Sequence, residues 1–319
     1  MPAFSPSLAA QDVSRMKLLF SARAAAARLS RPLQHRLARL VFPPGTQPDD
    51  FLQPAGEAAL LAPDSVSWRI FRNPVAMFVG GVTAVLLELA EPRVRSGVWE
   101  HTTFREQPLL RLQRTGYAAM MTVFGARSRT QAMIARINAG HARIEGFTPA
   151  GAAYRANDVE LLTWVHATAT FGFLQGYTTC VRAIDPADRD RFYRENQPVA
   201  RLYGAHAPPA SERELDALLE RMQAQLEPSA IVLEFLAIVR RVELLPRPLR
   251  WLQFLLVRVA VQNLPEQAKL RLMLDGAVWR VPPCQRALVR LLGRIADHLT
   301  LPTLPAMLAK ERLATKPAS

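Results

Sequence analysis

Two arginines and a threonine lie on one face of a predicted helix that begins at Pro108. Arg111, Arg114 and Thr115 are spaced i, i+3 and i+4, so their side chains project from the same side of that helix. Two fixed cations and a hydroxyl in this arrangement can donate hydrogen bonds to an anion or to a developing oxyanion. The same spacing fits a solvent-exposed face with Glu106 as its neighbour. The sequence leaves both interpretations open.

Two histidines fall among apolar residues of predicted helices. His141 continues the apolar stripe of Ile134 and Ile137, and Gly140 removes a side chain directly beside it. A buried imidazole needs a partner on each ring nitrogen, which is either a hydrogen-bonding group or a metal. His141 is therefore either a satisfied core residue or a metal ligand.

Small residues surround the second histidine, His166. Thr163, Ala167 and Thr170 lie near it along a helix that is otherwise apolar nearly all round. Small residues on a buried helix leave room for a flat ligand, and they equally let a neighbouring helix approach closely. Both interpretations stay open at the level of sequence.

The elements that position these residues are predicted to be helices throughout. No sustained alternation of apolar and polar residues is present, whereas capping residues and helix-initiating prolines recur before apolar-periodic runs. The predicted fold class is all-α, a single large bundle of about 10–12 helices. Helices are expected near 9–29, 50–61, 74–90, 108–124, 128–145, 157–182, 186–203, 211–226, 229–244, 248–263, 265–274 and 283–299.

Composition and charge narrow the class of protein. With 319 residues, 50% of them hydrophobic, the chain can bury a large core. The net charge of +13 comes almost entirely from arginine, a composition typical of a GC-rich bacterial genome. No basic run interleaved with aromatic residues and no helix-turn-helix spacing accompanies it, so specific nucleic-acid binding is not expected. Peripheral contact with an anionic membrane stays open.

Cysteine usage and hydropathy favour a reduced compartment. Cys180 and Cys284 fall in apolar helical runs and are expected to be buried free thiols. The N-terminal residues lack the clean apolar segment of a secretory signal. The apolar stretches 74–90 and 231–261 are short or interrupted by charges, so we expect core helices there. The predicted location is cytoplasmic, and peripheral attachment to the inner membrane is left open.

Several well-known constellations are missing from the sequence. It contains no C-x-x-C-H haem attachment, C-x-x-C pair, G-x-S-x-G elbow, Walker loop or G-x-G-x-x-G turn. The Glu-x-x-His pairs of di-iron bundles are missing too, because Asn138 and Thr163 stand three residues before the two histidines. Nucleotide enzymes, serine hydrolases and di-iron oxidases are poorly supported.

A set of short motifs, in a fixed order, resembles the bacterial and fungal family that contains latex-clearing rubber oxygenases and MpaB-type oxygenases. The resemblance covers roughly residues 66 to 260. Its most specific parts are the Arg-x-x-basic-Thr and Trp-Val-His-Ala-Thr elements. The motifs are Trp68-Arg69-x-Phe71, Asn73-Pro74, Glu91-Pro92-x-Val94, Gly97-Val98, Pro108-x-x-Arg111-x-x-Arg114-Thr115, Phe124-Gly125, His141-Ala142-x-Ile144-x-Gly146, Tyr154-x-Ala156-Asn157-Asp158, Leu161-x-x-Trp164-Val165-His166-Ala167-Thr168 and Arg191-Phe192-Tyr193.

The resemblance implies an all-helical, globin-reminiscent fold that holds non-covalent haem b, which in rubber oxygenases activates dioxygen for oxidative cleavage of C=C bonds. It implies that His141 is the iron ligand, with His166 as the second candidate and Thr170 as a further cofactor contact. It places the distal, catalytic element on Arg111, Arg114 and Thr115. The domain boundaries expected from it are an N-terminal helical extension at 1–65, a haem domain at 66–260 and C-terminal helices at 261–319 packed on the same core.

The sequence departs from the family pattern at one position. Arg114 stands where rubber oxygenases carry a lysine that can occupy the sixth iron position. A guanidinium has no lone pair for iron, so the sixth position is expected to be open or to hold water.

The function expected on these grounds is that of a haem-dependent oxygenase or peroxygenase that uses dioxygen and an apolar small-molecule substrate. The alternatives are a helical protein that binds a lipid-like ligand without redox chemistry, and a peripheral adaptor that acts through its arginine surface. The sequence does not indicate an oligomeric state.

Overall fold

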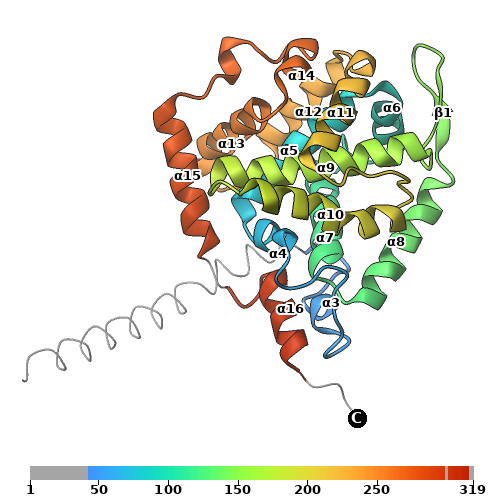
Figure 1. Cartoon of the computed structure of the whole chain (residues 1–319). Coiled ribbons are helices and arrows are strands. Elements are labelled where there is room, and N and C mark those ends of the chain that lie inside the picture. The colour runs from blue at the N-terminus through green and yellow to red at the C-terminus, as the bar shows by residue number, and fades with distance from the viewer. Residues whose placement is uncertain (1–41, 299–300, 316–319) are drawn as a thin grey trace, which may run out of the picture. The chain divides into compact units, whose positions relative to one another are not determined.

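The computed structural model describes residues 42–298 and 301–315, which form one compact unit (Figure 1). The helix predicted at 9–29 lies outside the described residues. The all-α prediction is confirmed, since the described part holds fourteen α-helices and one two-stranded sheet. The division of the chain at residues 65 and 260 stays a prediction.

The helices differ in length from 4 to 22 residues. They are α3 (Asp49–Leu52), α4 (Val66–Phe71), α5 (Pro74–Ala90), α6 (Pro92–Glu100), α7 (Pro108–Phe124), α8 (Arg127–His141), α9 (Val159–Cys180), α10 (Pro186–Leu202), α11 (Glu212–Met222), α12 (Ala230–Arg241), α13 (Arg250–Gln262), α14 (Glu266–Arg271), α15 (Pro283–Asp297) and α16 (Pro305–Ala314). Strands β1 (Glu145–Phe147) and β2 (Ala153–Arg155) form an antiparallel hairpin between α8 and α9.

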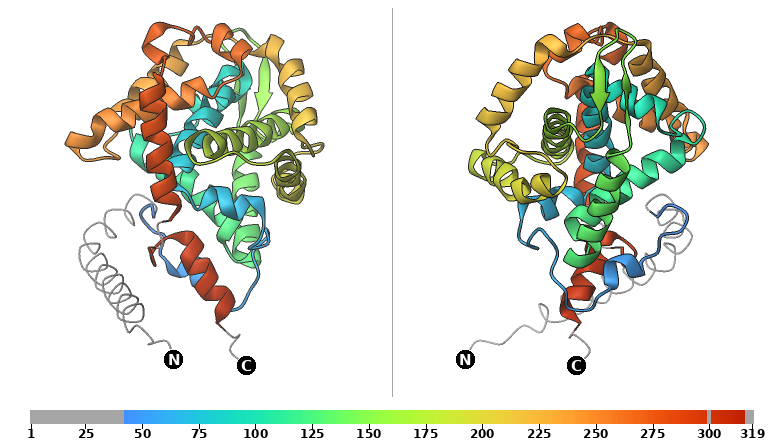
Figure 2. Two further views of the ribbon diagram at one scale, coloured as in Figure 1. Left: turned by 60° about the vertical axis from the view of Figure 1, so that its left-hand side comes forward. Right: turned by 90° about the vertical axis from the view of Figure 1, so that its right-hand side faces the viewer.

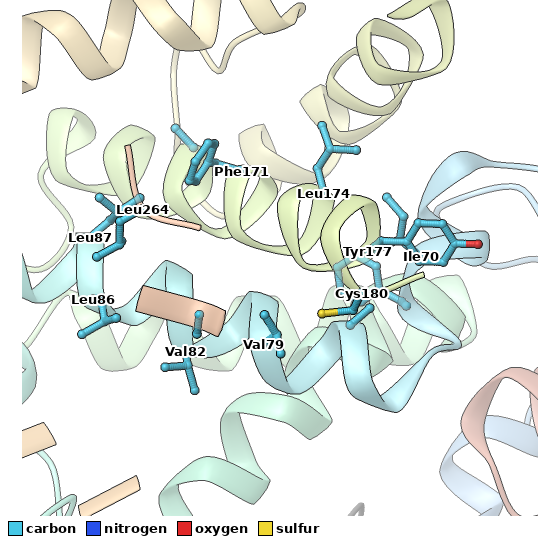
Figure 3. Packing of buried hydrophobic residues seen from close by; sticks show 14 of the residues in the cluster. Ile70, Val79, Val82, Leu86, Leu87, Phe171, Leu174, Tyr177, Cys180 and Leu264 are labelled. Carbon is cyan, nitrogen blue, oxygen red and sulfur yellow. The ribbon is translucent and has the colours of Figure 1, made fainter. Parts of the chain in front are cut away.

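The core is organised around α5 and α9, which pack against each other along their length (Figure 3). Gly172 of α9 lies against Gly80 and Ala84 of α5, whereas Gly176 lies against Ala76, so the two helices run antiparallel. A Cβ atom at Gly172 would be 2.4 Å from the carbonyl oxygen of Gly80, and one at Gly80 would be 2.7 Å from the carbonyl oxygen of Gly172. Only glycine lets the two backbones approach this closely.

The N-termini of both core helices are fixed by side-chain caps, as predicted from Asn73-Pro74 and Asn157-Asp158. The Oδ1 atom of Asn73 accepts hydrogen bonds from the backbone N–H groups of Val75 and Ala76, each at 3.1 Å, and its Nδ2 atom donates to the carbonyl oxygen of Gly293 in α15. Asp158 caps α9 in the same way. Such caps satisfy N–H groups that have no partner within the helix.

One end of the unit is closed by α3 and α16, which lie side by side (Figure 2). Arg312 of α16 is fully buried, and its guanidinium donates to the carbonyl oxygens of Phe51, Glu57 and Phe124 at 2.7 to 2.9 Å. These three donated hydrogen bonds stabilise a cation that would otherwise be costly to bury. The sequence prediction missed α16.

Several local predictions were wrong. The helix expected at 50–61 ends at Leu52, because Pro54 follows and biases the preceding residue away from the helical region. The helix expected at 128–145 ends at His141, and the chain turns there into the hairpin. Cys180 is buried as predicted, but Cys284 is exposed, because it lies in the first turn of α15.

Within the described residues, no single helix has both the length and the apolar character needed to cross a membrane. Two pairs of helices reach the required length and hydropathy only when both members of the pair are counted together, and each pair is sharply bent. They are α5 with α6 and the segment 212–225 with α12.

The glycine contact between the core helices predicts a specific loss of stability. Gly172→Ala should lower the free energy of unfolding by roughly 1–3 kcal/mol, because its methyl group overlaps the backbone of α5. Gly116→Ala in α7 is the matched control, since a Cβ there meets nothing within 4 Å and the change should stabilise by about 0.5–1 kcal/mol. Urea unfolding followed by circular dichroism measures both, and equal stabilities would contradict the packing argument.

Candidate functional site

The predicted site residues lie on helices that are only partly packed into the core. In α7 the buried side chains are those of Met121, Val123 and Phe124 in the last turn, and in α8 they are those of Thr130 and Ile134. The rest of each helix keeps accessible surface, and this includes the segments that carry the predicted site residues. Both helices therefore leave side chains free to face something other than protein.

Contacts near the end of α10 hold α7 and α8 in place. The hydroxyl groups of Thr122 in α7 and Tyr203 are 2.8 Å apart, and Nδ2 of Asn138 in α8 donates to the carbonyl oxygen of Leu202 at 2.8 Å. Asn138 lies one turn before His141, so this bond fixes the end of α8 that carries the imidazole.

The hairpin that follows His141 is anchored on α6. Tyr154 of β2 is buried, and its hydroxyl donates to the Glu100 carboxylate at 3.0 Å and lies 3.0 Å from Nε2 of His101. Gly146 pairs with Tyr154 across the hairpin, and a Cβ at Gly146 would be 2.7 Å from the tyrosine hydroxyl. Gly146 and Tyr154 of the family-like motif thus serve a packing role next to the site.

Three titratable groups from three helices interact electrostatically. Glu88 is near the C-terminal end of α5, Arg111 is in the first turn of α7, and His141 is the last residue of α8. Arg111 acts on both of the others, because its charge opposes the upward shift of the Glu88 pKa and helps to lower the His141 pKa. The structure therefore places Arg111 within electrostatic range of His141 and of a carboxyl group that sequence reasoning missed.

Burial controls the ionisation of Glu88. Desolvation raises the pKa of Glu88 from 4.5 to about 7, although the positive charge of Arg111 lowers it in part. No hydrogen bond or salt bridge joins this carboxyl to a residue of the described part. Near neutral pH such a group exists in both protonation states, so it can accept or give up a proton. The only signal in the sequence was a charged residue inside an apolar helix.

Arg111 is a desolvated cation without a salt-bridge partner among the described residues. Its pKa is lowered by burial, with Glu88 opposing and Arg114 adding to the shift. A guanidinium remains protonated even so, because its ordinary pKa is far above neutrality. It is therefore a fixed positive charge with donors free for a ligand.

His141 is neutral at physiological pH and incompletely satisfied. Its pKa is lowered by burial and then by the charge of Arg111. Its Nδ1 atom is buried and has no hydrogen-bond partner in the described part of the chain. A neutral imidazole has one nitrogen with a lone pair, and neither ring nitrogen is engaged by a described residue. Both the lone pair and the N–H of this ring remain available.

His166 stands apart from this group. Burial alone lowers its pKa to about 4, and no charge or hydrogen bond links it to Glu88, Arg111 or His141 in the described part of the chain. It is a neutral, half-buried imidazole on α9. The structure does not join the second candidate ligand to the first.

The remaining predicted residues offer less to a ligand. Arg114 and Thr115 are exposed, and the Thr115 hydroxyl donates to the carbonyl oxygen of Arg111 at 3.0 Å. Thr170 is buried, and its hydroxyl bonds to the carbonyl oxygens of His166 and Ala167, both at 3.0 Å. Helical threonines commonly use their hydroxyl in this way. These two hydroxyl hydrogens are thus directed at their own helices.

The residues present fit a haem with one axial histidine. Within 42–298 and 301–315, no group of three or more His, Cys, Asp or Glu side chains is placed to bind a metal ion on its own. A haem iron needs only one or two axial ligands from the protein. The imidazole of His141, whose Nδ1 atom is unpartnered among the described residues, could supply one.

Comparison with known families identifies the chain. The family described as "ER-bound oxygenase mpaB/B'/Rubber oxygenase, catalytic domain" matches residues 68–298. The chain belongs to this family. The match begins in α4 and ends just after α15, so it includes every helix that carries a predicted site residue. It confirms the family that the sequence motifs suggested, and with it an oxygenase catalytic domain. No curated protein and no solved structure matches the chain.

The raised pKa of Glu88 predicts a pH-dependent effect of Glu88→Gln. The folded protein binds the Glu88 proton more tightly than the unfolded chain does, so the wild type loses stability as the pH rises from about 4.5 through about 7. The amide of the glutamine variant cannot ionise, so this group causes no loss of stability in that pH range. Urea titrations at several pH values should show the stability of E88Q relative to the wild type increasing with pH and levelling above about 7. A constant difference would contradict the shifted pKa.

Proposed function

We propose that the chain is a haem-b-dependent oxygenase or peroxygenase that oxidises an apolar small molecule with dioxygen. The observation that carries the proposal is the electrostatic grouping of Glu88, Arg111 and His141 inside a domain of an oxygenase family. The group combines three chemically different side chains in a desolvated environment. They are a fixed cation, a neutral imidazole and a carboxyl that titrates near neutrality.

His141 would hold the cofactor through the lone pair of one ring nitrogen. A bound haem would supply the redox chemistry that activates dioxygen. A histidine that binds a metal normally donates a hydrogen bond from its other ring nitrogen, and this bond makes the ligand more basic. Nδ1 of His141 makes no such bond to a described residue. The ligand is therefore less electron-rich than a hydrogen-bonded histidine.

Arg111 and Glu88 would act on the substrate side. Arg111 would donate hydrogen bonds to negative charge that develops on oxygen, and low local dielectric strengthens such bonds. Glu88 would hold or remove a proton at its carboxyl oxygen, for which a pKa of about 7 is well suited. Arg114 has no lone pair to coordinate iron and is exposed, so it would contribute positive charge at a distance.

A visible absorption spectrum tests the proposal. Protein expressed with haem supply should show a Soret band that His141→Ala abolishes and His166→Ala retains, because only His141 belongs to the charged group. His206→Ala is the matched control, since His206 is exposed in a loop outside the site. Loss of the band in H166A with retention in H141A would move the ligand to α9.

The absence of any Soret band would instead favour the binding of a lipid-like ligand without redox chemistry. Arg111→Met should leave the band in place and slow the reaction with dioxygen, by on the order of 10²-fold if the guanidinium stabilises developing charge. An unchanged rate in this variant would remove Arg111 from the proposed mechanism.

A further inference from the structure

A pocket of about 590 Å³ lies between α9, α11, α13 and α15. This volume is within the range of about 300–1,000 Å³ typical of small-molecule sites. Its apolar wall includes Phe171, Val259 and Val289, all of which are buried. A cavity of this size with an apolar floor can take the hydrocarbon part of a ligand.

The pocket shares no lining residue with the proposed oxygenase site. Gln175 lines it and follows His166 by nine residues, about two and a half helical turns, so the two side chains point in opposite directions. None of Glu88, Arg111 and His141 lines the pocket. It is a separate site that the proposed reaction does not use.

Two guanidinium groups at this pocket have no anionic partner among the described residues. Arg286 and Arg290 are one turn apart on α15 and both are exposed. Arg286 donates to the side-chain oxygen of Gln262 at 3.0 Å, and Arg290 donates to the carbonyl oxygen of Thr179 at 3.4 Å. Neither arginine forms a salt bridge in the part of the chain that the structure covers.

A second pocket has arginines that are paired with carboxylates. It has a volume of about 240 Å³ and is lined by Arg69, Arg72 and Arg191. Each of these three arginines forms a salt bridge, with Asp188, Asp297 and Asp64 respectively. The larger pocket differs in that neither of its two lining arginines is paired with a described carboxylate.

Polar atoms in the wall of the larger pocket also lack partners. The Thr178 hydroxyl and Nδ2 of Asn263 are buried and have no hydrogen-bond partner within residues 42–298 and 301–315, whereas Oδ1 of Asn263 accepts from the Thr179 hydroxyl at 2.9 Å. Buried donors without acceptors are rare in native structures. After a small rotation of the side chains, an oxygen atom of a ligand would accept a hydrogen bond from the Asn263 amide or from the Thr178 hydroxyl.

We propose that this pocket binds an amphipathic molecule whose apolar body lies against Phe171, Val259 and Val289 and whose singly charged oxyanion is held by Arg286 and Arg290. A carboxylate matches the planar guanidinium better than a neutral headgroup does. Asp216 of α11 also lines the pocket, and its negative charge disfavours a doubly charged headgroup. The chemical class is thus an apolar carboxylic acid.

Calorimetric titration of the full-length protein with decanoate, decanol and decyl phosphate at about pH 8 tests this assignment. Decanoate should bind more tightly than the neutral alcohol and than the phosphate, which is largely a dianion at that pH. The double variant R286Q/R290Q should weaken decanoate binding by more than about tenfold. Arg294→Gln is the matched control, since Arg294 is on the same helix and does not line the pocket.

A second variant blocks the pocket without removing charge. Gln175→Trp should abolish decanoate binding by filling the cavity, and an unchanged melting temperature in the absence of ligand shows that the variant folds. Decanoate binding that survives both R286Q/R290Q and Q175W, or no decanoate binding at millimolar concentration, would overturn the proposal. If decyl phosphate bound more tightly than decanoate, the proposal of a singly charged headgroup would be overturned. Haem loading should be unaffected by these variants, so the outcome is independent of the oxygenase proposal.

Discussion

The close contact between the backbones of α5 and α9 is the constraint on which the rest of the structure depends. Gly80, Gly172 and Gly176 leave no room for a Cβ, so the two helices can pack in only one register. Asp297 of α15 secures the same pair at the start of α5. It bonds to Arg72 and Asn73 there, and to Arg182 just after α9. Burial alone would raise the pKa of Asp297, but these bonds hold it below its usual value.

Charged groups are desolvated near the C-terminal end of α5. Glu88 is carried by the same helix as Gly80, two turns further on, and α7 and α8 bring Arg111 and His141 toward it. Removal from water raises the pKa of the acid and lowers the pKa of the imidazole. The site therefore contains a neutral base, a titratable acid and a permanent cation, a combination that an exposed surface would not maintain.

The long helices were predicted well from the sequence where a capping residue or an initiating proline marks the start of the helix. The ranges 74–90 and 108–124 match α5 and α7 at both ends, because a proline begins each helix and an asparagine caps α5. Short elements that depend on distant partners were missed. The helix α16 is held by Arg312 through carbonyl groups from three separate segments, which no local pattern reveals.

The candidate site was predictable only in part, for the same reason. Arg111 and His141 were identified through motif spacing, whereas Glu88 became visible only when the fold placed it within range of Arg111. The close approach of Gly172 and Gly176 to α5 was not predicted, because it depends on a helix distant in sequence. The cofactor contact of Thr170 stays a prediction, and the structure shows that its hydroxyl donates to carbonyl oxygens of its own helix. The positions of these side chains relative to one another depend on the tertiary structure, which local sequence patterns do not show.

The most direct test of the charged group is an NMR titration of Glu88 and His141 in the wild type and in Arg111→Gln, with Arg114→Gln as the control. If the three groups share one desolvated space, removal of the Arg111 charge raises the pKa of both Glu88 and His141, and the exposed Arg114 has a smaller effect. Unchanged pKa values for both groups in Arg111→Gln would contradict the account.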